Sequence, residues 1–377
     1  MNRVETRIDP MVLGAPVASL PKPRGRWVLP IAGVALVIVA ITSLAVGPTG
    51  ITLGSLPRAL MAGIGGDITD PLLRREHLVL FGIRLPRMLL GAFVGSALAV
   101  AGAMMQGLFR NPLADPGLIG VSSGAALAAV AIIALGATPA LAWMRVFGFY
   151  ALPVAAFVGG LVTSLVLVWI ANRGGALSVA TLLLSGVAIA AIAGALTGLM
   201  AYVSDDRELR DLTLWSMGSL AGSSWTKVTA ILPFVAALAI VTPSLARALN
   251  GFLLGEAEAY HLGIAVERVK LVIVVTTAAA VGAAVAVAGI VGFVGLVVPH
   301  FVRLLTGPDH RMVLPVSAVL GAALVVGADV VARIIVAPAE LPLGIVMAVI
   351  GGPVFLHLVL SRGVAGADWW AGPSSAV

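Results

Sequence analysis

Few residues of this 377-residue sequence have the types and spacing that catalysis requires. Residues 120–124 read GVSSG and match the G-x-S-x-G pattern of a serine nucleophile, but they open an apolar run and lack the preceding strand that a nucleophile elbow needs. The phosphate-binding pattern G-x-x-x-x-G-K-[ST] is absent, because none of Lys22, Lys227 and Lys270 follows a glycine. The sequence therefore predicts no catalytic residue and no ATP site of this type.

Two ionisable groups, His300 and Asp329, lie deepest within apolar sequence. A carboxylate or histidine relay inside a membrane would point to a proton-coupled carrier. Asp329 stands four residues before Arg333, however, which is the spacing of an ion pair on one helix face. We interpret Asp329 as a structural partner of Arg333, with a proton relay as the alternative. The sequence has no cysteine, so we predict no Cys-ligated metal and no disulfide.

The composition places the chain in a membrane. Hydrophobic residues make up 60% and charged residues 11% of the sequence, against roughly 25% charged residues in soluble domains. Backbone in lipid must satisfy its own hydrogen bonds, and barrel strands would alternate in polarity, so near-continuous apolar runs predict helices. We predict an all-α polytopic membrane protein with about ten transmembrane helices, the eighth too short to cross as a straight helix. The runs are 28–46, 85–108, 117–136, 152–171, 179–202, 226–246, 267–290, 293–305, 313–336 and 342–360.

Basic residues set the predicted orientation. An even number of helices puts both termini on one side, and a cytoplasmic N-terminus leaves 13 of the 23 basic residues inside. We therefore predict a cytoplasmic extension over 1–27, a membrane domain over 28–361 and a cytoplasmic tail over 362–377. The exceptions gather in one predicted outer loop. That loop contains Arg74, Arg75, Arg84 and Arg87.

Those four arginines break the charge rule for membrane loops. A partner that carries carboxylates would explain them, because arginine pairs carboxylates bidentately. Ordinary solvated loop charge is the alternative interpretation.

One segment, 244–270, mixes apolar with acidic residues and is divided by Gly251, Gly255 and Gly263. This pattern predicts one or two short helices on the cytoplasmic surface. Helices that lie in a lipid surface usually carry a basic polar face, so the acidic residues here favour a protein partner.

Seven motifs resemble one family of membrane proteins, and they occur in family order from about residue 28 to 361. They look like those of the permeases of the vitamin B12, ferric siderophore and haem ABC importers. The motifs are IRLPR (83–87), MQGLFRNPLADPGLIG (105–120), LLLSGVA (182–188), LWSMGSLAG (214–222), LLGEAEAYHLGI (253–264), GIVGFVGLVVPHFVRL (289–304) and PAELPLGIVMAVIGGPVF (338–355).

The resemblance implies the type II ABC importer permease fold and alternating access in a homodimer of ten-helix subunits. It further implies two separate ATP-binding cassette subunits, which hold ATP and Mg, and one periplasmic substrate-binding protein. This chain would then be a multi-pass protein of the bacterial inner membrane, in contact with membrane lipid, with no cofactor, metal or nucleic acid of its own.

The resemblance also assigns roles to particular residues. Arg84, Arg87 and Arg333 would form the docking surface for the binding protein, where they would meet acidic residues on its two lobes.

For the translocation pathway, the resemblance places Asn111 and Leu113 at the inner constriction, facing Ser178, Val179 and Ala180. Relatives often have small hydroxyl residues where this chain has Val179 and Ala180. We therefore predict a constriction closed by apolar contact.

For energy coupling, the resemblance points to Leu254, Gly255, Glu256, Leu262 and Gly263, which would seat in a groove of the ATPase. A helix in such a groove is held by a few apolar anchors.

The basic extension and the sequence DPLLRREHLVLFGIRLPR (70–87) look most like those of the haem importers, so we predict haem as cargo. Ferric siderophores and cobalamin are the alternatives. A secondary, ion-coupled carrier is a less favoured alternative, because it would need inverted repeats or an ion site. A membrane enzyme would need a convergent set of catalytic groups.

Overall fold

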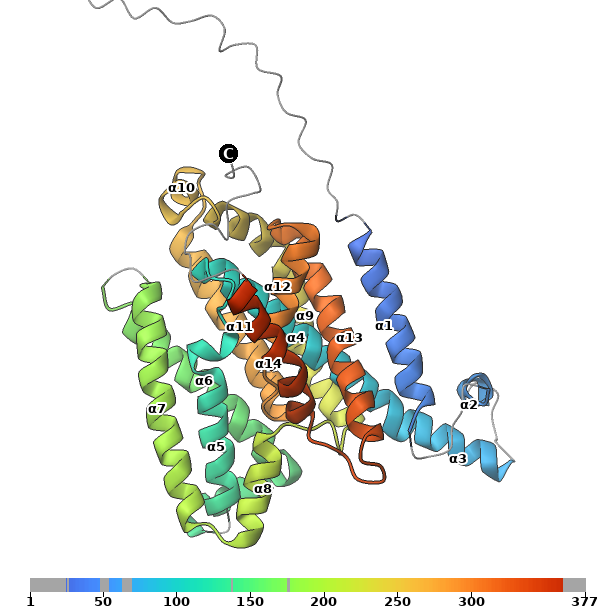
Figure 1. Ribbon diagram of the computed structural model, residues 1–377. Helices are drawn as coiled ribbons and strands as arrows, with labels where there is room; N and C mark the ends of the chain where they lie inside the picture. Colours follow the sequence, from blue (N-terminus) through green and yellow to red (C-terminus); the bar gives the residue numbers. More distant parts are fainter. Residues whose placement is uncertain are drawn as a thin grey trace, which may run out of the picture.

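The computed structural model describes residues 25, 27–47, 54–62, 70–136, 138–174 and 177–361, and within these ranges it is helical with no strand (Figure 1). The predicted tail and all but the last residues of the predicted extension lie outside the described residues. The helices of the first half are α1 (Val28–Ala45), α2 (Leu56–Ala62), α3 (Pro71–Val79), the π-helical turn η2 (Leu80–Arg84), α4 (Leu85–Phe109), the 3-10 turn η3 (Pro116–Ile119), α5 (Val121–Leu135), the 3-10 segment η4 (Pro139–Tyr150) and α6 (Ala151–Ala171). Those of the second half are α7 (Val179–Val203), α8 (Asp206–Ser216), α9 (Trp225–Phe252), α10 (Glu256–His261), α11 (Val266–Ala288), α12 (Val294–Thr306), α13 (His310–Ile334) and α14 (Leu343–Ser361).

These helices match the ten predicted membrane segments. Among the described residues, seven helical stretches have the length and composition to cross a membrane, and three shorter apolar ones lie in α5, α12 and α14. Each predicted run overlaps one of the ten. The all-α membrane architecture predicted from composition is therefore confirmed, including the short eighth segment, which is α12 with 13 residues.

Helix α4 lies at the centre of the bundle, packed against α9, α11, α12 and α13 (Figure 1). Two crossings depend on glycine, because a Cβ at Gly95 or Gly102 would collide with the backbone of Gly321 on α13 or Gly295 on α12. Small residues allow such close approach where lipid offers no hydrophobic driving force between helices. Tight packing on α4 thus positions the start of α12 and the middle of α13.

Helix α7, unlike the central helix α4, is largely exposed in the described chain. It stands at one side of the bundle (Figure 1), and its Gly194 and Gly198 have no atom within 4 Å of where a Cβ would lie. Many of its large apolar side chains are exposed. A long helix that is apolar all round and covered on so little of its surface presents that surface to lipid or to another subunit.

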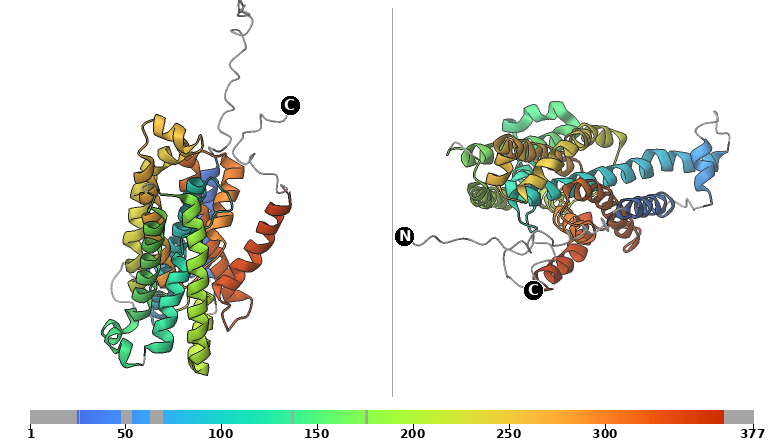
Figure 2. Two further views of the ribbon diagram at one scale, coloured as in Figure 1. Left: turned by 90° about the vertical axis from the view of Figure 1, so that its left-hand side faces the viewer. Right: turned by 90° about the horizontal axis from the view of Figure 1, so that it is seen from above.

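The predicted outer loop is helical instead. Asp70 accepts a hydrogen bond from the backbone N–H of Leu72 at 2.9 Å and Pro71 follows it, a favourable start for a helix. Residues 71–109 are then continuously helical through α3, η2 and α4. The π-helical turn ends at Arg84, two residues before Pro86. Its wider hydrogen-bond spacing changes the backbone pairing next to a proline, which has no N–H to donate. Figure 2 shows α2 and α3 reaching out from the bundle.

The segment 244–270 contains one short helix, α10, between the end of α9 and the start of α11. Gly255 and Gly263 bracket it with φ angles of +125° and +81°, which residues with a Cβ rarely adopt. A Cβ at Gly251 would collide with the side chain of Ile264. Gly255 and Gly263 therefore make the sharp turns that set α10 apart at one end of the bundle (Figure 1), and Gly251 allows the residues after α10 to pack closely against α9.

Candidate functional site

A cluster of buried arginines joins α1, α4 and α13 at the end of the bundle opposite α10 (Figure 1). Arg87 bridges two carboxylates, with Nη2 2.9 Å from Asp329 Oδ1 and Nη1 2.8 Å from Glu340 Oε1. Asp329 Oδ2 also lies 3.1 Å from Arg333 Nε, which confirms the predicted ion pair within one helix. Buried charges need such partners. Asp329 is thus held between two guanidinium groups.

The other contacts of the cluster reach α1. Arg84 donates to the carbonyl of Leu44, and Arg333 Nη2 donates to Ser43 Oγ at 3.0 Å. Glu340 lies in the connection between α13 and α14, and its hydrogen bond from Arg87 lowers the pKa of its carboxyl group. The cluster therefore ties the end of α1 to the core.

These contacts revise the predicted docking surface. The exposed fractions of Arg84, Arg87 and Arg333 are 3%, 9% and 6%, so the three side chains do not form an exposed surface in the described chain. The reason is that residues 71–109 are helical and α4 packs against α13, which packs in turn against α1, so that Arg84 and Arg87 face these helices. Sequence reasoning missed Glu340, although it lies in the motif PAELP.

The loop between α4 and α5 is tightly structured by its own polar side chains. Asn111 Oδ1 accepts from the N–H of Leu113 at 2.9 Å, and Asp115 Oδ1 accepts from the N–H of Gly117 at 2.7 Å. Arg110 adopts the left-handed conformation at the end of α4, with φ of +49°. Asn111 itself is exposed and Leu113 is half-buried. These hydrogen bonds therefore hold the loop in one conformation at the surface, with the side chain of Leu113 half-buried.

The start of α7 carries the other predicted gate residues. Ser178 caps the helix, with its Oγ accepting from the N–H of Thr181 at 3.2 Å. Val179 is half-buried and Ala180 is exposed. The η3 turn, which lies within the α4–α5 loop, packs against α7. The fold thus brings the two predicted halves of the gate onto neighbouring elements.

Helix α10 presents apolar side chains at its end of the bundle. The exposed fractions of Leu254, Tyr260 and Leu262 are 65%, 70% and 65%. A shallow cavity of about 460 Å³ lies beside them, between Glu256, Tyr260 and Arg268. Exposed aromatic and aliphatic side chains on a short, glycine-bracketed helix are typical of a surface for another protein.

The predicted coupling residue Glu256 is exposed at the surface, but its carboxylate holds a buried cation. Its carboxylate Oε2 lies 2.6 Å from the ammonium of Lys270, whose side chain is buried. Lys270 also bonds Glu267 at 3.2 Å and donates to the carbonyl of Leu177 at 3.2 Å, and Glu267 Oε2 accepts from the N–H of Leu177 at 2.7 Å. Sequence reasoning missed Lys270. The signal for it was the three-residue spacing of Glu267 and Lys270, which places them on one helix face.

Residues 35–361 match the FecCD transport family. The chain belongs to this family. Membership confirms the resemblance to the vitamin B12, ferric siderophore and haem permeases that the motifs indicated. It also covers nearly all of the membrane domain, so the arginine cluster, the α4–α5 loop and α10 all lie within the matched region.

Curated relatives include permeases for two kinds of cargo. The hemin transport system permease protein of Yersinia pestis is 47% identical over 282 residues, 74% of this chain and 82% of the relative. The cobalamin import system permease protein of Halobacterium salinarum is 41% identical over 364 residues, 88% of this chain and 95% of the relative. The vitamin B12 import system permease protein of Escherichia coli is 42% identical over 298 residues, 79% of this chain and 87% of the relative.

A solved structure has the same fold. It is described as an inward-facing conformation of a metal-chelate type ABC transporter, and it is 31% identical in sequence. The superposition has a TM-score of 0.76 and covers 89% of this chain and 99% of the solved chain. The chain is therefore an ABC importer permease of the iron-chelate and vitamin B12 family in fold as well as in sequence.

Proposed function

We propose that this chain is the membrane-spanning permease subunit of an ATP-driven haem importer. The observation that carries haem as the cargo is the 47% identity to the hemin permease, which exceeds the 41% and 42% to the cobalamin and vitamin B12 permeases. ATP hydrolysis would then occur in two separate cassette subunits that bind ATP and Mg, and a periplasmic binding protein would deliver the haem.

Helix α10 supports the coupling to an ATPase. Tyr260 on α10 and Leu254 and Leu262 on its flanking turns are exposed apolar side chains, and Gly255 and Gly263 fix the two turns. A groove on the ATPase would take these side chains as anchors. Since Glu256 is bonded to Lys270, we assign it to holding α10 in place and assign the contact itself to the apolar side chains.

The exposed α7 supports a homodimer. Leu184, Val187 and Leu199 have exposed fractions of 73%, 64% and 60%, and Gly194 and Gly198 leave room for close approach of a second helix. The gate residues at the start of α7 would then meet those of the partner around a shared pathway. Both termini would lie in the cytoplasm, and the membrane would be the bacterial inner membrane.

The binding protein would dock at the end of the bundle that carries the arginine cluster. Because Arg84, Arg87 and Arg333 are buried, we propose that they hold the ends of α1, α4 and α13 in the arrangement that the binding protein recognises, and do not themselves contact it.

A transport assay with defined cargo tests the proposed function. The dimer, reconstituted in proteoliposomes with its cassette ATPase, is supplied with the cognate binding protein loaded with haem, cobalamin or a ferric siderophore. We expect haem to stimulate ATP hydrolysis and to accumulate inside. Stimulation by none of the three would contradict the importer itself, whereas stimulation by another cargo would contradict only haem.

Cobalamin is the second candidate, because the cobalamin permease of Halobacterium salinarum matches 88% of this chain and the hemin permease 74%. Stimulation by cobalamin in place of haem in the same assay would support it.

A further inference from the structure

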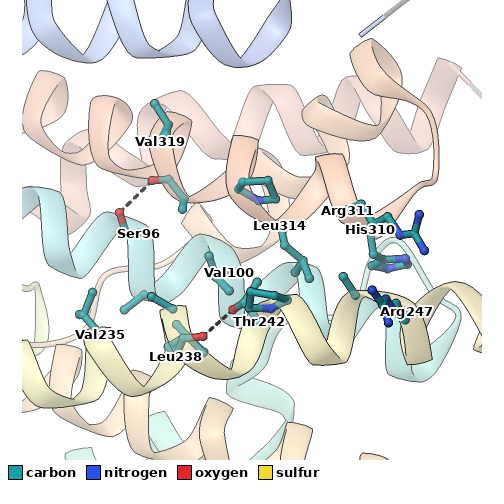
Figure 3. A pocket seen from close by; sticks show the side chains of 16 residues that line it. Ser96, Val100, Val235, Leu238, Thr242, Arg247, His310, Arg311, Leu314 and Val319 are labelled. Carbon is teal, nitrogen blue, oxygen red and sulfur yellow. Dashed lines mark hydrogen bonds between the residues drawn. The ribbon is translucent and has the colours of Figure 1, made fainter. Parts of the chain in front are cut away.

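A groove of about 670 Å³ lies between α4, α9 and α13 (Figure 3), and none of its lining residues belongs to α7 or to the α4–α5 loop. Its volume falls in the range of about 300–1,000 Å³ that is typical of small-molecule sites. Ala239 on α9 is exposed at its rim, so the groove is open along one side. The groove belongs to a membrane-spanning part of the chain, since α4, α9 and α13 all have the length and composition of spanning helices.

The walls of the groove are apolar in their chemistry. Two hydroxyl groups line it, and both are turned to the backbone: Ser96 Oγ donates to the carbonyl of Ala318 at 2.9 Å, and Thr242 Oγ1 donates to the carbonyl of Leu238 at 2.6 Å (Figure 3). A hydroxyl that already donates its proton to the backbone does not need a hydrogen-bond acceptor on the ligand. The wall therefore suits a hydrocarbon chain.

One end of the groove is cationic. Figure 3 shows Arg247 and Arg311 together with His310 at this end, far from Ser96 and Val319 at the other. Arg247 and Arg311 are exposed, and within the described chain neither forms a salt bridge. Guanidinium groups bind phosphate bidentately.

The cationic end is held in a fixed geometry. Asn250 near the end of α9 joins the start of α13, with its Oδ1 accepting from the N–H of His310 at 2.8 Å and its Nδ2 donating to Asp309 Oδ1 at 2.6 Å. Arg247 and Arg311 extend from these joined helix ends. They lie at the α10 end of the bundle, where α9 and α13 leave the apolar layer and a lipid headgroup would lie.

We propose that this groove binds an anionic glycerophospholipid, with an acyl chain along the apolar wall and the phosphate between Arg247 and Arg311. Basic pockets between membrane helices select anionic headgroups in this way. The lipid is not the transported substrate, because the groove is lined by α4, α9 and α13, and the predicted gate lies on α7 and the α4–α5 loop. The proposal holds whichever chelate the protein carries.

The test uses the intact permease–ATPase complex in nanodiscs of phosphatidylcholine, with and without phosphatidylglycerol. After detergent extraction, native mass spectrometry measures the lipid retained on each complex. We expect phosphatidylglycerol to be retained in preference to phosphatidylcholine. In Arg247→Gln with Arg311→Gln this preference should fall roughly 30-fold, which corresponds to about 1 kcal/mol for each of two basic residues. Arg173→Gln, which removes an exposed arginine outside the groove, should retain the wild-type preference.

A second variant and a second readout keep the proposal falsifiable. Ala239→Trp fills the apolar rim and should exclude both lipids from the site while leaving the arginines in place. Phosphatidylglycerol should raise the thermal midpoint of the wild-type complex by mass action and should not raise that of Ala239→Trp. Equal retention of the two lipids by the wild type, or unchanged retention in both variants, would overturn the proposal.

Discussion

The ammonium of Lys270 lies 2.6 Å from the carboxylate of Glu256, so a buried cation on α11 is held against the first residue of α10. The same ammonium donates to the carbonyl of Leu177, the residue before the predicted gate at Ser178. A movement of α10 imposed by an ATPase would therefore reach the start of α7 through one side chain.

Lys270→Met should separate ATP hydrolysis from transport, because the substitution keeps the buried aliphatic chain and removes the three polar contacts. We expect the variant complex to assemble and hydrolyse ATP while cargo uptake falls severalfold. Lys270→Arg keeps the charge and should restore part of the uptake. Parallel assays of hydrolysis and uptake in proteoliposomes measure the split, and unchanged coupling in Lys270→Met would show that the contacts serve only packing.

Leu254→Asp should weaken the attachment of the ATPase. Truncating or charging an apolar anchor costs over about 1 kcal/mol, which corresponds to an affinity roughly fivefold lower or more. Leu254→Met keeps an apolar side chain of similar size and is the matched control. Affinity is measured by titrating the ATPase onto immobilised permease. Wild-type affinity in Leu254→Asp would remove this residue from the interface.

Leu113→Ser should raise the leak of small solutes through reconstituted dimers. Leu113 is half-buried in the α4–α5 loop. A narrow pathway lined by apolar side chains excludes water and ions by dewetting, and a hydroxyl group there would let water enter. Leu113→Met keeps the constriction apolar and should leak no more than the wild type. Efflux of a trapped fluorescent dye from proteoliposomes measures the leak. Equal efflux from all three proteins would contradict an apolar gate at this position.

Arg87→Met should destabilise the protein, because it leaves Asp329 and Glu340 without their shared cation. Breaking a buried ion pair costs roughly 3–5 kcal/mol. Arg75→Gln, on the exposed face of α3, should change stability by less than about 0.5 kcal/mol. Thermal unfolding of the purified dimers compares the two. If Arg87→Met unfolds like the wild type and only loses binding-protein association, the arginine acts at an exposed docking surface after all.

The sequence determined the membrane class, the ten segments and the family. Length and hydropathy of a spanning helix are local properties, so α1 and even the short α12 could be recognised without knowledge of their neighbours. The Asp329–Arg333 pair was predictable for the same reason, since both residues lie on one turn of one helix. Local glycine placement predicted a short helix within 244–270, but the prediction was too wide, because residues 244–252 continue α9 and residues 266–270 begin α11.

Only the tertiary structure decided which way the charged side chains face. Arg87 meets Asp329 and Glu340 across separations of 242 and 253 residues, and Lys270 meets Leu177 across 93, so no local pattern could have paired them. The arginines looked like an exposed loop because the sequence alone does not show which face of their helix packs against the rest of the protein. Packing of α4 against α13 through glycines, and of α13 against α1, fixed the direction of that face and buried the charges.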